Sequence, residues 1–174
     1  MRKNAPAICM IGLLALVGLG CVEHQGQLGV FLTAANAGTT LAISPQQVTV
    51  EIVGVDVLDS ESGNFVTLSA GSQLYEILGL DGNQQLLALA DRLDEGTYQQ
   101  IRLRFSEVNS TVVNAGGRRE KLKIDPEAVT VGIPFTVQTD GSTQVIIALD
   151  IDQSLSQKSN GRWVLRPVLR PGAN

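Results

Sequence analysis

Short apolar runs recur along residues 28–170 and are separated by clusters of Gly, Asn, Asp and Ser. The run from Tyr98 to Val108 is the clearest, because its aliphatic and aromatic residues alternate with Arg102 and Arg104. A period of two places one face of a strand in a core and the other in water. Repeated along the chain, the pattern predicts about eight to ten strands and an all-β domain.

Local signals divide these runs into strands and turns. Gln46–Leu58 reads as a long strand whose apolar phase slips beside Gly54, which predicts a β-bulge there. Ser60–Asn64 predicts a turn. Residues 84–92 fit either a strand or a short helical turn. We therefore predict an antiparallel two-sheet β-sandwich, immunoglobulin-like or transthyretin-like, over residues 28–170, with residues 171–174 as a tail.

The N-terminal segment has a different pattern. Arg2 and Lys3 precede about thirteen almost wholly apolar residues, Ala7–Leu19, and a polar stretch follows Cys21. This length is typical of a signal peptide and falls short of the ~20 residues that span a bilayer. We predict that residues 1–21 are an export signal and that residues 22–27 are a short tether.

The end of that segment, Gly18–Cys21, resembles the lipobox of bacterial lipoproteins, in which the cysteine is lipidated and becomes the new N-terminus. The resemblance implies that Cys21 is the lipidated residue and that the chain is anchored to a membrane of the cell envelope. Val22, rather than Asp, follows the cysteine, which implies the outer membrane if the organism is Gram-negative. The alternative is a secreted protein that is cleaved nearby.

Composition narrows the chemistry of the remaining chain. The signal carries two basic residues and no acid, so its removal leaves 11 basic and 17 acidic residues, a net charge of −6. An acidic domain of this kind is not expected to bind nucleic acid. Both cysteines lie in the first 21 residues, and the only histidine is His24. The domain therefore lacks zinc ligands and a histidine base, and we predict that it is not an enzyme and needs no cofactor.

Carboxylates are the remaining candidates for a site. Asp150 and Asp152 lie two apart on a predicted strand, so both side chains would project from one face. They could form half of a calcium site, because calcium prefers six to eight oxygen ligands. Additional ligands could come from Ser154, Asp56, Asp59 or Asp81. Alternatively, the two acids are surface residues that pair with Arg102, Arg104 or Arg166.

Two further features have alternative interpretations. The basic cluster Arg118–Lys123 could bind phosphates of lipid headgroups or acidic glycans, or it could be an edge strand protected by its lysines. Trp163, the only tryptophan, could be a core residue or an exposed platform for a sugar.

Five segments in order along the chain also resemble the bacterial domain of unknown function 4382, which occurs mostly in exported proteins and lipoproteins. They are residues 74–82, 96–103, 134–137, 149–154 and 163–168. The resemblance implies a β-sandwich in the envelope and implies no activity.

Together these features predict a membrane-anchored envelope lipoprotein that acts as a non-catalytic interaction or structural module with a protein or glycan partner. The alternative is a calcium- or glycan-binding β-sandwich.

Overall fold

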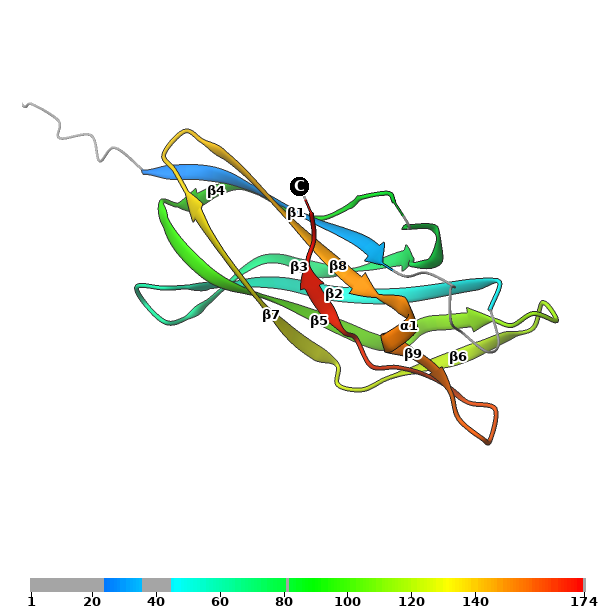
Figure 1. Ribbon diagram of the computed structural model, residues 1–174. Coiled ribbons are helices and arrows are strands. Elements are labelled where there is room, and N and C mark those ends of the chain that lie inside the picture. Colours follow the sequence, from blue (N-terminus) through cyan, green and yellow to red (C-terminus); the bar gives the residue numbers. More distant parts are fainter. Residues whose placement is uncertain (1–23, 36–44, 81, 174) are drawn as a thin grey trace, which may run out of the picture.

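The described residues form two β-sheets that pack against each other around one apolar core (Figure 1). The computed structural model describes residues 24–35, 45–80 and 82–173. Cys21 and the rest of the predicted export signal therefore lie outside the described residues, as does Asp81. The predicted all-β sandwich is confirmed.

The smaller sheet has the strand order β11-β8-β1-β4. Its strands are β1 (Gln25–Ala35), β4 (Gln85–Asp94), β8 (Ser142–Asp150) and β11 (Leu169–Pro171). Residues 84–92, which fitted a strand or a helical turn, therefore belong to a strand.

The larger sheet has the order β3-β2-β5-β6-β10-β9, and β7 also pairs with β5. Its strands are β2 (Gln47–Asp59), β3 (Phe65–Glu76), β5 (Gly96–Val113), β6 (Arg119–Ile124), β7 (Ala128–Val137), β9 (Leu155–Gln157) and β10 (Trp163–Leu165). Two short helices, η1 (Leu78–Leu80) and α1 (Ile151–Ser154), connect strands.

Both sheets are mixed, so the predicted antiparallel arrangement holds for most strand pairs but not for all. β1 pairs with β8 in parallel, and β10 pairs with β6 in parallel. Parallel neighbours need a long connection, and these pairs join segments far apart in the sequence. The alternation of apolar residues shows which face of a strand is buried, but it does not encode the direction of its neighbour.

The strand boundaries also correct the predicted tether. β1 begins at Gln25, inside the predicted tether 22–27, because Gln25 pairs with Asp94 and Gln27 pairs with Ser142. These residues are polar, so the pattern of apolar positions did not identify them as part of a strand. All described elements lie between Gln25 and Pro171, so residues 22–174 contain the complete described fold.

The predicted bulge in β2 is confirmed. Val50 and Val55, on either side of it, are at most 1% exposed, and the register to both neighbouring strands shifts between Ile52 and Gly54. The bulge changes which residues face inward, so apolar side chains reach the core both before and after it.

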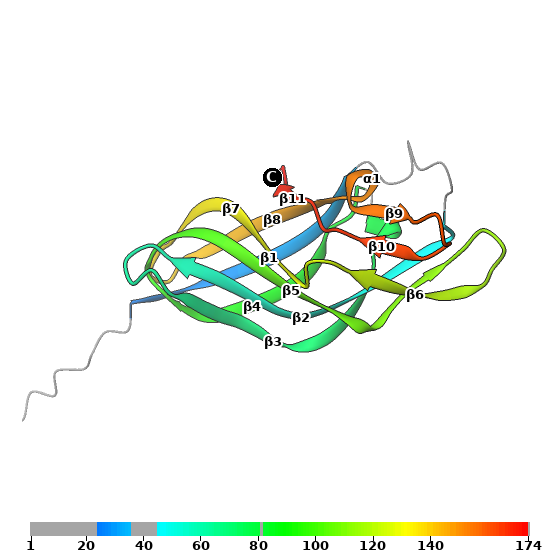
Figure 2. The ribbon, with the colours of Figure 1, turned by 90° about the horizontal axis from the view of Figure 1, so that it is seen from below.

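The long strand β5 connects opposite ends of the molecule. It begins at Gly96, beside the Gln25–Asp94 pair at which β1 starts, and it ends at Val113, before the hairpin that leads into β6. Its 18 residues span at most about 60 Å. Figures 1 and 2 show the start of β1 and the β5–β6 hairpin at opposite ends in both views. Within the described ranges, no helix has the length and apolar character needed to cross a bilayer.

Candidate functional site

Asp150 and Asp152 do not share a strand face, which corrects the geometry predicted for them. β8 ends at Asp150, and the chain then turns into helix α1. Asp150 is fully buried and caps this helix, since one carboxylate oxygen accepts a hydrogen bond from the backbone N–H of Gln153 at 3.1 Å. Asp152 lies half-buried in the first turn of α1.

The environment of Asp150 is that of a structural ion pair. Its Oδ2 lies 2.6 Å from Nη2 of Arg170 on β11, so the partner is not one of the three arginines considered from the sequence. The part of the chain that the structure describes contains no group of three or more His, Cys, Asp or Glu side chains placed to hold a metal ion.

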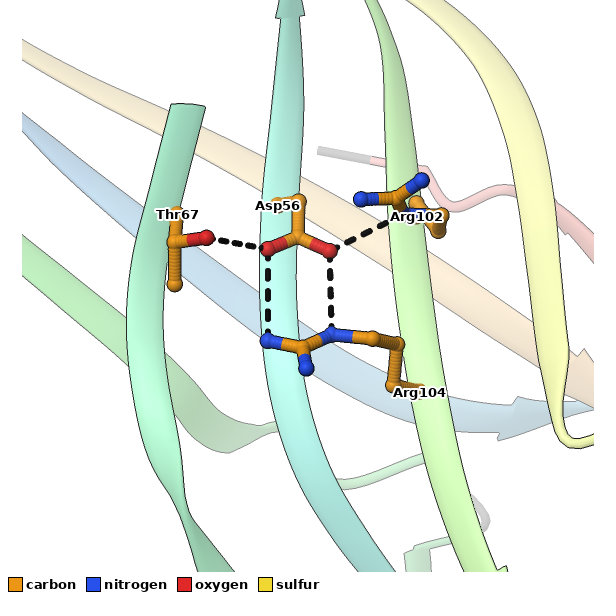
Figure 3. A network of polar contacts seen from close by, with 4 residues as sticks. All are labelled: Asp56, Thr67, Arg102 and Arg104. Atoms are coloured by element: carbon orange, nitrogen blue, oxygen red, sulfur yellow. Dashed lines mark hydrogen bonds and ion pairs between the residues drawn. The ribbon is translucent and has the colours of Figure 1, made fainter. Parts of the chain in front are cut away.

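A second buried acid, Asp56, lies on the face of β2 that is opposite the core. Its Oδ1 accepts a hydrogen bond from Oγ1 of Thr67 at 2.7 Å, and its Oδ2 accepts bonds from Nε of Arg102 at 2.9 Å and Nε of Arg104 at 3.1 Å (Figure 3). Gly54 makes room for this arrangement, because a Cβ there would lie 2.2 Å from Nη2 of Arg104. The network connects β3, β2 and β5.

The single carboxylate of this network faces two positively charged guanidinium groups. Burial raises the pKa of Asp56, but hydrogen bonds from Thr67 and Arg102 and the charges of the two guanidinium groups outweigh it, so the pKa lies below its ordinary value. Arg102 also stacks over the Phe65 ring, with its guanidinium carbon 3.9 Å from the ring centroid. We interpret the Asp56 network as structural, since its carboxylate stays ionised and fully hydrogen-bonded.

A third buried acid, Glu51, fills an irregularity between β2 and β5. The register passes from Thr49–Thr111 to Glu51–Ser106, so β5 carries extra residues at this point. The backbone and side-chain nitrogens of Asn109 donate to the Glu51 carboxylate at 3.1 and 2.7 Å. Hydrogen bonds from Ser106, Ser72 and Asn109 lower the pKa of Glu51 from 4.5 to about 2.

This irregularity also shapes a nearby concave surface, which we call the basic groove. The extra residues of β5 include Glu107 and Val108, which line the groove. The other walls come from β6, the β5–β6 hairpin and the β9–β10 hairpin, and the groove has a volume of about 1100 Å³. Its basic residues are Arg118, Arg119, Lys121, Lys123, Lys158 and Arg162.

The alternation of β6 explains the orientation of three of these cations. Leu122 and Ile124 are at most 2% exposed, so Arg119, Lys121 and Lys123 lie on the opposite, exposed face of the strand. Residues two apart on a strand are separated by about 6.7 Å, which gives a regular row of positive charges.

Pairing between distant segments completes the groove. β10 lies beside β6 with Trp163 opposite Leu122, and this brings the hairpin that carries Lys158 and Arg162 next to β6. The sequence identified the Arg118–Lys123 cluster but gave no sign of these two additional cations, because a parallel pairing across about forty residues leaves no local pattern.

The groove differs from the rest of the described surface in the ion pairing of its cations. Within the described residues, none of its six cations forms an ion pair, whereas Arg102, Arg104, Arg166 and Arg170 each do. The two acids of the groove already hold other groups: Glu107 accepts a hydrogen bond from the backbone N–H of Ile124, and Glu120 accepts one from Asn114. With six cations and two acids in its lining, the groove carries an excess of positive charge.

Two interpretations from the sequence are settled by this geometry. β6 has neighbours on both sides, β5 and β10, so the edge-strand interpretation is wrong. Trp163 is 1% exposed and belongs to the core, which excludes the exposed sugar platform.

Comparison with known proteins gives one match. The family described as "Domain of unknown function (DUF4382)" matches residues 25–167. No curated protein and no solved structure is significantly similar to the chain.

Proposed function

Since the chain belongs to the family of domain of unknown function 4382, whose description assigns no activity, we propose a function from the geometry of its surface. The chain is a membrane-anchored, non-catalytic interaction module of the bacterial cell envelope, and it binds an anionic ligand in the basic groove.

The observation that carries this proposal is the excess of positive charge in the groove. Six of the 11 basic residues that follow Cys21 line one concave surface, although this part of the chain has a net charge of −6. A cleft in which charges of one sign outnumber those of the other concentrates its electric field and attracts ligands of the opposite sign, and the six cations of the groove outnumber its two acids. Three of the six are arginines, whose planar guanidinium groups can bind carboxylates or phosphates through two hydrogen bonds.

Anchoring is supported by the sequence. The apolar segment Ala7–Leu19 and the lipobox-like Gly18–Cys21 favour export followed by lipidation of Cys21. Stable attachment requires two or more membrane signals, and the acyl chains of a bacterial lipoprotein supply them.

A non-catalytic role is supported by the state of the buried acids. The pKa values of Glu51 and Asp56 are lowered rather than raised, so both are ionised at neutral pH and unsuited to act as general acids. Both carboxylates are also engaged by several hydrogen-bond donors of the fold.

Binding is tested with residues 22–174 and inorganic polyphosphate as a polyanionic probe, by isothermal titration calorimetry. We expect binding that the double substitution Lys121→Gln and Lys123→Gln weakens about tenfold, because two ionic contacts are lost. Arg166→Glu is the matched control: it changes the net charge by the same −2, but Arg166 lies outside the groove and pairs with Asp125. Equal binding by the wild-type and the double variant would refute the proposal.

Anchoring is tested separately in a bacterial host with the full-length chain. We expect the chain to incorporate labelled palmitate and to sediment with membranes. Cys21→Ser should abolish the incorporation of palmitate, whereas Cys9→Ser, within the apolar segment, should leave both properties intact. Palmitate incorporation that survives Cys21→Ser would exclude a lipid anchor at this residue.

A further inference from the structure

We infer that the ligand of the basic groove is an acidic polysaccharide chain located away from the membrane to which the protein is attached. The inference rests on the proposed function and specifies its ligand. Three observations lead to it: the position of the groove relative to the anchor, its shape, and the chemistry of its lining.

The groove lies at the end of the molecule opposite the start of β1. Gln25, where β1 begins, pairs with Asp94 next to the start of β5, and the far end of β5 leads through Val113 into the hairpin that carries Arg118. Figure 2 shows β6 and the start of β1 at opposite ends of the long axis. The strand between them spans at most about 60 Å.

A short connection keeps the start of β1 close to the anchor. Four residue steps separate Cys21 from Gln25, and a fully extended chain covers at most about 14 Å over that distance. Surface charges are screened over about 8 to 10 Å at physiological salt, so the headgroups of the anchoring membrane do not act on the groove when the domain stands away from the bilayer. In that orientation the groove is placed to meet a ligand that extends toward the domain.

The shape of the groove fits a chain better than a flat surface. Two hairpins, residues 114–118 and 158–162, border the concavity, and Arg119, Lys121 and Lys123 form a row along β6 between them. The row lies in a concave surface, which a planar layer of headgroups does not match in shape. A linear polymer with repeated negative charges can lie along the row itself.

The lining favours sugars over nucleotides. Single-stranded nucleic acids are held by aromatic side chains on which bases stack, and the only aromatic residue of the groove, Trp163, is 1% exposed. Asn160 lies among the cations, and its Oδ1 accepts a hydrogen bond from the backbone N–H of Arg162 at 3.1 Å. Its amide nitrogen supplies an uncharged donor for hydroxyl groups beside the cations that bind carboxylates.

The experiment compares three probes with residues 22–174: polygalacturonate, uncharged dextran, and vesicles of phosphatidylcholine and phosphatidylglycerol in a 7:3 ratio. We expect binding to polygalacturonate only, measured by calorimetry for the polymers and by co-sedimentation for the vesicles. The double substitution Lys121→Gln and Lys123→Gln should weaken polygalacturonate binding about tenfold. Arg166→Glu, with the same net charge as the double variant, should change it less than twofold.

The outcomes separate this inference from the proposed function. Groove-dependent binding of polyphosphate or of the anionic vesicles without binding of polygalacturonate would overturn the polysaccharide assignment and leave an anion-binding groove. Binding of polygalacturonate that the double variant retains in full would place the ligand elsewhere and overturn the inference. Failure of every anionic probe would overturn both.

Discussion

Two groups of positive side chains lie on the larger sheet, and they differ in what neutralises them. Arg102 and Arg104, in the middle of β5, share the fully buried carboxylate of Asp56 and connect three strands. Among the residues that the structure describes, no acid forms an ion pair with the cations of the basic groove, at the far end of the same sheet. The comparison teaches that the ion-pair partners of a positive side chain indicate its role better than its charge does. The first group maintains the fold, and we propose that the second binds a ligand.

The largest expected effect comes from removing the acid of the first group. Asp56→Ala leaves two partly exposed guanidinium groups without their partner and empties a buried position, so we expect the free energy of unfolding to fall by about 2 to 3 kcal/mol. Urea denaturation of residues 22–174 measures it. Asp125→Ala is the control, because the Arg166–Asp125 contact is exposed and 3.7 Å long, and it should cost about 0.5 kcal/mol or less. If the two variants unfold at the same urea concentration, the Asp56 network does not hold the sheet together.

The second expected effect is on the stability of the fold at low pH. The folded pKa of Glu51 is about 2 against an ordinary value of 4.5, so its carboxylate stabilises the fold above pH 4.5, and this stabilisation is lost as the pH falls toward 2. In Glu51→Gln the contribution of this ionisation is absent at every pH. We therefore expect the wild-type protein to lose more stability than the variant between pH 5 and about 2.5, as measured by urea midpoints. Parallel pH profiles of the two proteins would contradict the lowered pKa.

The smallest expected effect is on the stability of the groove variant. Lys121 and Lys123 are exposed, and no acid of the described residues pairs with either, so replacing both with Gln should change the free energy of unfolding by less than about 0.5 kcal/mol. The same urea measurement as for Asp56→Ala checks it. A loss comparable to that of Asp56→Ala would erase the distinction between the two groups and would make the row of lysines part of the structure.

Short-range patterns in the sequence predicted a large part of this fold. The alternation along Tyr98–Val108 identified the core face of β5, and the slip of apolar phase beside Gly54 identified the bulge of β2. Both are local consequences of side-chain period and backbone geometry, and a single segment contains all the information that they need.

Features that depend on distant segments were not predicted. Asp56 was considered as a helper for calcium, and its arginine partners became apparent only when the β2–β5 register was known. Likewise, the sequence located Arg118–Lys123 but not the contribution of Lys158 and Arg162, because the pairing of β6 with β10 sets it. The end of β8 at Asp150 was missed because the alternation of apolar residues continues through Ile151 although the backbone has already turned.

The position of β1 has a mechanical consequence. β1 is hydrogen-bonded along one edge to β4 and along the other to β8, and it is the first strand after the predicted attachment point. A pull between the start of β1 and the far end, where β6 lies, runs along the strands rather than across them (Figure 1). Such a load acts in shear on both ladders, so many backbone hydrogen bonds resist it together, and β1 cannot be unzipped one bond at a time.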